Sequence, residues 1–188
     1  MSGPRVVGIG GTTRPGSSGE RLVRAVLAAC EDRGATTRMF GGADLAALPH
    51  FAPEIPERTE AQRDFVAAVR ECDGLVIGTP GYHGGVSGLV KNAIDLLEDL
   101  NAGTRVYFDR RAVGLVVSAA GWQACGVTLQ ALRGIVHAMR GWPTPIGIAL
   151  NSAEQRPFDE DGRLIDNALT RQVALQAEQI LFLAGAAR

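Results

Sequence analysis

The 188-residue chain has few cysteines, few aromatic residues and almost no net charge. Its three cysteines, Cys30, Cys72 and Cys125, lie far apart, and none belongs to a CxxC motif or a Cys/His cluster. This spacing argues against structural zinc and iron–sulfur sites, because both need closely spaced thiolate or imidazole ligands. We therefore expect no metal site, and we expect Cys30 and Cys72 to be small core residues.

The chain also lacks an excess of charge of either sign. Its 19 basic and 20 acidic residues give a net charge of −1 at pH 7. Such a balance provides no electrostatic footprint for nucleic acid or for an anionic membrane surface. No apolar run approaches the roughly 18 residues of a membrane-spanning helix, and the first residues do not have the pattern of a secretory signal. We therefore expect a cytoplasmic protein that binds neither nucleic acid nor membranes.

What the sequence does have is an ordinary globular composition, with 46% hydrophobic and 21% charged residues. Short apolar runs alternate with segments whose apolar residues recur at helical spacing. This alternation predicts one α/β domain over residues 1–188, a three-layer sandwich around a five-stranded parallel sheet of flavodoxin-like order 2-1-3-4-5. The expected strands are 6–9, 36–40, 74–78, 112–117 and 146–150. The expected helices are 22–30, 59–71, 86–100, 123–140 and 166–184. Residues 41–58 are expected to form a long surface loop.

In such a sheet, ligands bind beyond the carboxyl ends of the strands, which makes the loops after the first, third and fourth strands the candidates. The first of these loops, residues 10–19, is rich in glycine and hydroxyl side chains and leads into a helix. Backbone N–H groups, the helix N-terminus and Arg14 together favour a phosphate. The loop lacks GK[ST] and GxGxxG, and no acidic residue ends the second strand, so it favours a mononucleotide. The alternative is a glycine-rich turn that binds nothing.

The other two loops suit a planar ring. Residues 79–88 contain one proline, four glycines and the rings of Tyr82 and His83. Such a loop can hold a heterocycle by stacking and by backbone hydrogen bonds, although ordinary loop packing explains both rings as well. The small residues from Ser118 to Gly121 leave room for a ring beside them. Trp122 follows them; it either closes the pocket or packs in the core, on the surface or at an interface. We identify no catalytic acid or base.

Two of these loops resemble those of the NADPH-dependent FMN reductase family, whose fold is flavodoxin-like. The family's first loop reads roughly GSxRxxSxN, and residues 11–19 read GTTRPGSSG; the second reads roughly TPEYHGSxSGxLKNALD, and residues 79–95 read TPGYHGGVSGLVKNAID. The chain departs from the family at Gly19, where the family has Asn, and at Gly81, where it has Glu. The resemblance implies that the FMN phosphate binds Thr12, Arg14, Ser17, Ser18 and Gly19. It implies that the flavin ring lies against Pro80, Gly81, Tyr82, His83, Gly84, Ser118, Ala119, Ala120, Gly121 and Trp122.

The same resemblance implies an activity. NADPH, or NADH, is expected to deliver a hydride to N5 of FMN, and the reduced flavin then passes electrons to a second acceptor or leaves as product for a partner monooxygenase. FMN itself, quinones, azo dyes and metal oxyanions all remain possible acceptors. The alternative from another class is an FMN-binding electron carrier or redox-linked interaction protein without NADPH oxidation.

The resemblance also bears on assembly, whereas the arginines of the chain bear on the choice between NADPH and NADH. The family is usually dimeric or tetrameric, so we expect a homodimer or homotetramer. Its interface is expected to include the helix from Val86 and the loop near Phe51. Arg14, Arg110 and Arg111 are the candidates for meeting the 2′-phosphate of NADPH.

Overall fold

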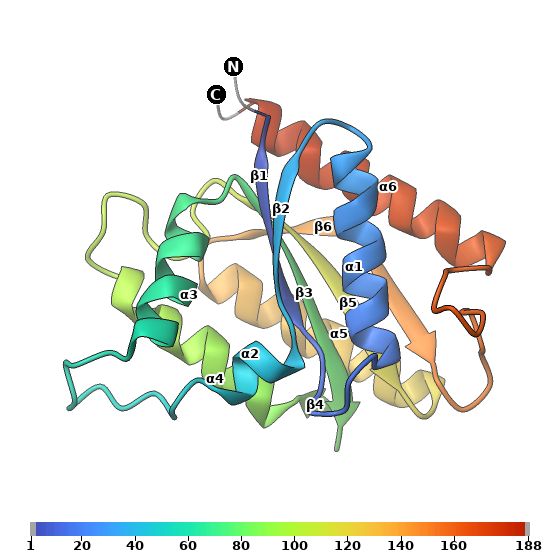
Figure 1. The fold of residues 1–188 in the computed structure, drawn as a ribbon, viewed down its shortest axis with the longest axis horizontal. Helices are drawn as coiled ribbons and strands as arrows, with labels where there is room; N and C mark the ends of the chain where they lie inside the picture. Colours follow the sequence, from blue (N-terminus) through green and yellow to red (C-terminus); the bar gives the residue numbers. More distant parts are fainter. Residues whose placement is uncertain (1–2, 187–188) are drawn as a thin grey trace.

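The computed structural model describes residues 3–186 and shows a twisted sheet between two layers of helices (Figure 1). Five parallel strands run in the order β2-β1-β3-β5-β6, and the short β4 pairs antiparallel with the end of β3. The strands are β1 (Arg5–Gly10), β2 (Thr36–Phe40), β3 (Gly74–Tyr82), β4 (Gly85–Val86), β5 (Ala112–Ala119) and β6 (Trp142–Asn151). The flavodoxin-like order predicted for the parallel strands is confirmed. The sequence did not predict β4, because a strand of two residues is too short to show alternating polar and apolar positions.

Helices cover both faces of the sheet. The helices are α1 (Ser18–Glu31), α2 (Gly42–Ala46), α3 (Glu60–Glu71), α4 (Gly88–Leu96), α5 (Trp122–Ala138) and α6 (Asn167–Ala186), and a 3₁₀ turn, Leu97–Leu100, extends α4. Residues of α1 and α6 form one apolar cluster on one face, and residues of α3, α4 and α5 form a second cluster on the other. The sheet thus separates two cores, as a three-layer α/β/α sandwich requires.

Local signals explain where several helices begin. The Ser17 side chain accepts a hydrogen bond from the Glu20 N–H at the start of α1, and the Ser87 side chain accepts one from the Val90 N–H at the start of α4. Thr59 and Gln62 form a capping box at the start of α3. The helix predicted over 86–100 therefore begins at Gly88, two residues later than expected, because Ser87 is its N-cap.

The expectation that residues 41–58 form an uninterrupted loop is wrong. Residues Gly42–Ala46 form α2, and the Asp44 carboxylate accepts a hydrogen bond from the Gly41 N–H at its start. One helical turn is too short to show a repeated apolar spacing in the sequence. Only Leu45 and the neighbouring Leu48 supply its apolar contact with the core.

The cysteines are core residues, as predicted for Cys30 and Cys72. All three are buried and free. Burial raises the pKa of the Cys30 thiol to about 12 and that of the Cys72 thiol to about 11. Both therefore stay protonated and unreactive at neutral pH, since the thiolate is the reactive form.

Side chains form hydrogen bonds with backbone groups of β6, the strand at one edge of the sheet. Arg133 of α5 donates to the Thr144 and Pro145 carbonyls at 3.0 and 3.1 Å, and the Ile146 N–H donates to the Gln179 side chain of α6 at 3.1 Å. Proline also removes the N–H at positions 143 and 145. This part of the sheet edge is therefore protected against the addition of another strand.

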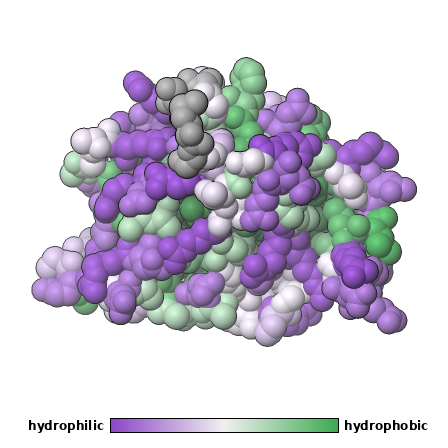
Figure 2. All heavy atoms as spheres, turned by 45° about the horizontal axis from the view of Figure 1, so that its top comes forward, coloured by the Kyte–Doolittle hydropathy of each residue, from purple (hydrophilic) through white to green (hydrophobic). Residues whose placement is uncertain are grey.

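Polar and apolar side chains are unevenly distributed on the face shown in Figure 2. Hydrophilic side chains predominate on the face shown in Figure 2, and hydrophobic ones form small, separate groups there. Among the described residues, no helix has both the length and the apolar character needed to cross a membrane.

A buried arginine fastens the connection before β5. Arg111 is completely buried, and its guanidinium donates to the carbonyls of Tyr107 and Arg70, both at 2.7 Å. Burial lowers the pKa of this guanidinium. Arg105 adds a bond of 3.0 Å to the Cys72 carbonyl. The two arginines thus satisfy carbonyls at the carboxyl end of α3, where a helix leaves acceptors unpaired.

We predict that Arg111→Ala lowers the free energy of unfolding by about 3 kcal/mol, because it opens a cavity and removes the donors of two partly buried carbonyls. Urea denaturation followed by circular dichroism measures the change. The exposed neighbour Arg110 provides the control, since Arg110→Ala should alter the free energy by no more than about 0.5 kcal/mol. Equal effects of the two substitutions would refute this role of Arg111.

Candidate functional site

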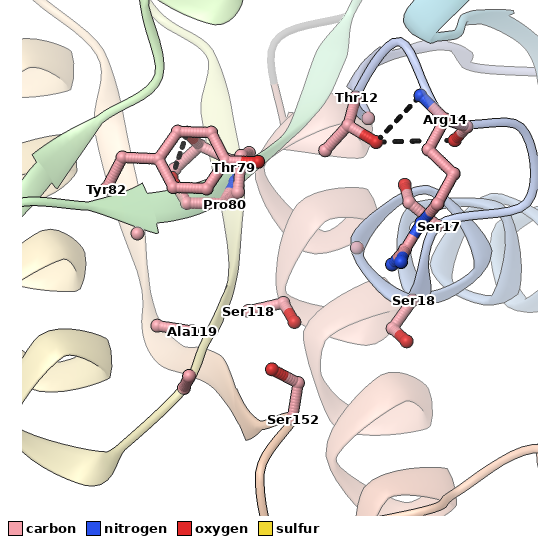
Figure 3. A pocket seen from close by; sticks show the side chains of 14 residues that line it. Thr12, Arg14, Ser17, Ser18, Thr79, Pro80, Tyr82, Ser118, Ala119 and Ser152 are labelled. Atoms are coloured by element: carbon pink, nitrogen blue, oxygen red, sulfur yellow. Dashed lines mark hydrogen bonds between the residues drawn. The ribbon is translucent and has the colours of Figure 1, made fainter.

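A pocket of about 270 Å³ opens at the carboxyl edge of the sheet, where the chain leaves four of its parallel strands (Figure 3). Its residues come from the segment after β1, from the ends of β3 and β5, and from the first residue after β6. The lining residues are Gly11, Thr12, Arg14, Ser17, Ser18, Gly19, Thr79, Pro80, Gly81, Tyr82, Ser118, Ala119, Ala120 and Ser152.

One side of the pocket is suited to an anion. The Thr12 hydroxyl accepts a hydrogen bond from the Arg14 N–H at 3.2 Å, which shapes the loop that precedes α1. Figure 3 shows the Arg14 side chain beside Ser17 and Ser18, at the positive end of the 14-residue helix α1. Arg14 is exposed, so its charge remains available to a ligand without a large desolvation penalty.

The opposite side is built from the end of β3 and its hairpin. The Thr79 hydroxyl accepts from the Ser87 N–H at 3.0 Å and donates to the Pro80 carbonyl at 2.9 Å. These bonds hold the hairpin of β3 and β4 against the start of α4. The ring of Tyr82, 56% exposed, stands at the end of this hairpin.

The third side consists of small residues with close neighbours. A Cβ on Gly81 would lie 2.8 Å from the Thr128 hydroxyl oxygen and 2.9 Å from the Ala119 Cβ. Such distances leave no room for a methyl group, so glycine at this position keeps the hairpin close to α5. The wall formed by Gly81, Ala119 and Ala120 offers a flat ligand little steric obstruction.

The structure brings most of the predicted residues together. Every residue predicted for the phosphate side lines the pocket, and so do Pro80, Gly81, Tyr82, Ser118, Ala119 and Ala120 from the ring side. His83, Gly84, Gly121 and Trp122 are not among the lining residues. For these four residues, and for the others, contact with FMN stays a prediction.

The structure shows where three of those four residues lie. His83 and Gly84 have φ values of 52° and 78° and form the turn between β3 and β4. Trp122 is half exposed and donates from its indole N–H to the Glu154 carboxylate at 3.1 Å. Its ring thus joins the start of α5 to the segment after β6.

The suggestion that Arg110 or Arg111 meets a nicotinamide cofactor at this site is wrong. Both residues precede β5, whereas the pocket lies beyond the opposite end of that strand. Arg111 is also completely buried. Among the residues that line the described pocket, Arg14 is the one cation.

Sequence reasoning did not identify Ser152. This residue follows β6, and its N–H donates to the Ala119 carbonyl at 2.9 Å. The rule that ligands bind beyond the carboxyl ends of strands applies to β6 as well as to its neighbours. The polar residues directly after the last predicted strand were therefore a usable signal.

The pocket fits the phosphate and the ring of a flavin mononucleotide. Hydroxyls, a helix N-terminus and one arginine lie on one side, and small residues with one exposed aromatic ring lie on the other. A Cβ on Gly19 would have the Ser118 Cβ, at 3.9 Å, as its nearest neighbour, so the absence of the family's Asn leaves space beside Ser118.

Comparison with known proteins identifies related chains. Residues 4–155 match the family described as NADPH-dependent FMN reductase. An FMN-dependent NADPH-azoreductase of Staphylococcus haemolyticus is 32% identical over 115 residues, which are 61% of this chain and 57% of that protein. One from Staphylococcus aureus is 32% identical over 131 residues, which are 69% of this chain and 65% of that protein. The chain thus matches less than two thirds of the length of either relative.

A solved structure shares the fold. The flavoenzyme NAD(P)H:(acceptor) oxidoreductase FerB of Paracoccus denitrificans superposes with a TM-score of 0.77, covering 97% of this chain and 98% of that one. Its sequence identity is 16%, so this likeness concerns the fold alone.

We predict that Gly81→Ala destabilises the protein by about 1–3 kcal/mol, because the added methyl group overlaps Thr128 and Ala119. Thermal or urea denaturation measures the change. The double substitution Gly81→Ala with Thr128→Ala should recover part of the loss, since it removes one of the two overlaps. Gly19→Ala is the control and should stabilise helix α1 by about 0.5–1 kcal/mol. A Gly81→Ala protein as stable as the parent would contradict the close packing of this wall.

Proposed function

Because the chain belongs to the NADPH-dependent FMN reductase family, we propose that it is an NAD(P)H-dependent flavin reductase. In this proposal NADPH, or NADH, donates a hydride to FMN, and the electrons pass to a small-molecule acceptor or leave with the reduced flavin. The observation that carries the proposal is a single pocket with an anion-binding side and a flat side of small residues.

The residues of the chain have binding and orienting roles in this proposal. Thr12, Arg14, Ser17 and Ser18 hold the phosphate, and the segments 80–82 and 118–120 border the ring. Bound FMN supplies the redox chemistry, since it accepts a hydride at N5. The lining residues that can ionise are Arg14 and Tyr82, and Arg14 serves the phosphate. The chain therefore acts through position and electrostatics, with no side chain assigned to proton transfer.

The names of the staphylococcal relatives favour an azo compound as one acceptor. A small, partly open pocket also admits quinones and a second flavin, and a partner monooxygenase that takes up reduced FMN fits the same chemistry. We place the protein in the cytoplasm as one flavin-binding domain.

A homodimer or homotetramer is part of the proposal. Asn92 of α4 accepts a hydrogen bond from the Phe51 N–H at 2.8 Å and donates to the Pro49 carbonyl at 3.1 Å. The 49–51 segment is thereby held on the outer side of α4 as a defined surface. Light scattering tests the assembly, and a fully active monomer would remove it from the proposal.

The reductase activity has a direct test. We predict that NADPH bleaches the visible absorption band of the FMN-loaded protein under anaerobic conditions, because hydride transfer to N5 of the bound flavin would reduce it. In air, the rate of NADPH oxidation is then measured while FMN is raised from below to far above the protein concentration. Saturation at one FMN per subunit identifies a prosthetic group, and a rate that keeps rising identifies FMN as substrate. A band that NADPH does not bleach would contradict the proposal and favour an electron carrier.

We further predict that Arg14→Ala weakens FMN binding by about tenfold and leaves riboflavin binding unchanged, because a charge-assisted bond to a phosphate contributes about 1.5–3 kcal/mol and riboflavin has no phosphate. Quenching of flavin fluorescence measures both affinities. Arg33, which is exposed beyond the far end of α1, is the matched control, and Arg33→Ala should change neither affinity. Equal losses of FMN and riboflavin affinity would show that Arg14 does not bind the phosphate.

A further inference from the structure

The segment after β6 is fastened to the loop after β5 by several hydrogen bonds. The Ser152 N–H donates to the Ala119 carbonyl at 2.9 Å, and the Gly121 N–H donates to the Asn151 side-chain oxygen, also at 2.9 Å. The Trp122 indole donates to the Glu154 carboxylate at 3.1 Å. The small-residue wall of the pocket therefore depends on a segment outside both family motifs.

Asn151 occupies the buried centre of this junction. Its side chain is completely buried, and the same oxygen that accepts from Gly121 also accepts from the Ala153 N–H at 3.1 Å. The Asn151 N–H in turn donates to the Gln155 side chain at 2.9 Å. One side chain thus sets the path of two loops, and burial makes the loss of either bond costly.

The bond between the Asn151 side chain and the Gly121 N–H lies where the loop after β5 turns into helix α5. The φ of Gly121 is 128°, and helix α5 begins directly after this residue without a side-chain cap. The Asn151 oxygen is thus the acceptor that orients the peptide N–H of Gly121 at the junction between the loop and the helix. Without it, the Gly121 N–H loses its acceptor, and the loop between Ala119 and α5 keeps the Ser152–Ala119 backbone bond at its first residue.

We infer that Asn151 is a positioning residue for the flavin ring, acting through the loop 119–121 and not through contact with the ligand. This inference rests on the proposed function, since it assigns the ring to the wall formed by that loop. Ser152, the next residue, lines the pocket and brings a hydroxyl to the same wall. Figure 3 shows the Ser152 side chain, directly after β6, on the same side of the pocket as the Ser118 side chain of β5.

The chain offers a closely matched control in Gln176 of α6. Gln176 is also a completely buried amide, and its nitrogen donates to the carbonyls of Leu115 and Ile146, both at 3.1 Å. Each of the two amides makes two backbone bonds through one atom and has a second polar atom without a partner in the described structure. Gln176, however, bridges β5 and β6 away from the pocket.

The experiment compares Asn151→Ala, Asn151→Asp and Gln176→Ala with the parent protein. For each we measure the thermal midpoint without flavin, the affinity for FMN, the visible spectrum of bound FMN, and hydrogen exchange of residues 119–125 without flavin. Asn151→Ala should weaken FMN binding roughly tenfold, shift the flavin band and speed exchange in the 119–125 segment. Asn151→Asp keeps an oxygen that accepts from the Gly121 N–H and should bind FMN more tightly than Asn151→Ala, even though its buried carboxyl group lowers the thermal midpoint.

Gln176→Ala should lower the thermal midpoint to a similar extent while the affinity for FMN and the flavin spectrum stay unchanged. The inference is overturned if Asn151→Ala binds FMN with the parent's affinity and spectrum, or if Gln176→Ala weakens binding as much as Asn151→Ala does. If the parent protein does not bind FMN at all, the proposed function fails, and the role assigned to Asn151 toward a flavin fails with it. The exchange measurement then still shows whether Asn151 holds the loop, which separates the two failures.

Discussion

Parallel pairing of β1, β3 and β5 is the constraint on which the pocket depends. In the observed register Gly10 lies opposite Gly78, Gly78 opposite Val116, and Pro80 opposite Ser118. Strands that pair in parallel and in step end at the same edge, so the loops that follow them must meet there. A ligand between these loops contacts residues that are more than 100 positions apart in the chain, such as Thr12 and Ser118.

Glycine allows neighbouring strands, and the sheet and α1, to approach closely near this edge. A Cβ on Gly10 would lie 2.4 Å from the Gly78 carbonyl oxygen, and one on Gly78 would lie 2.4 Å from a methyl carbon of Val23 in α1. The first turn of α1 can therefore rest directly on the ends of β1 and β3. This close approach is what brings the positive end of the helix to the pocket, where it adds to the charge of Arg14.

Much of this arrangement could be predicted from the sequence, and the misses have physical reasons. The five parallel strands and the long helices each show their own periodicity, and the two motif loops are local in sequence. Neither β4 nor α2 is long enough to show a period. Arg110 and Arg111 lie away from the pocket because residues that precede a strand lie at the edge opposite its carboxyl end. Composition could not distinguish the exposed Arg14 from the buried Arg111, since the difference arises from packing.

Asn151 illustrates a different limit. The Asn151 side chain accepts a hydrogen bond from the Gly121 N–H, 30 positions away in the chain. No local sequence pattern predicts a hydrogen-bond partner at that distance. The loop it supports contains Ala119 and Ala120, whose side chains restrict the backbone more than glycine does. A wall of small side chains has few interlocking contacts of its own, so its shape must come from hydrogen bonds to neighbouring segments. In this chain the segment directly after β6 provides them, and the same segment adds Ser152 to the pocket. The pocket is therefore better described by four strand ends than by the two loops that carry the family's motifs.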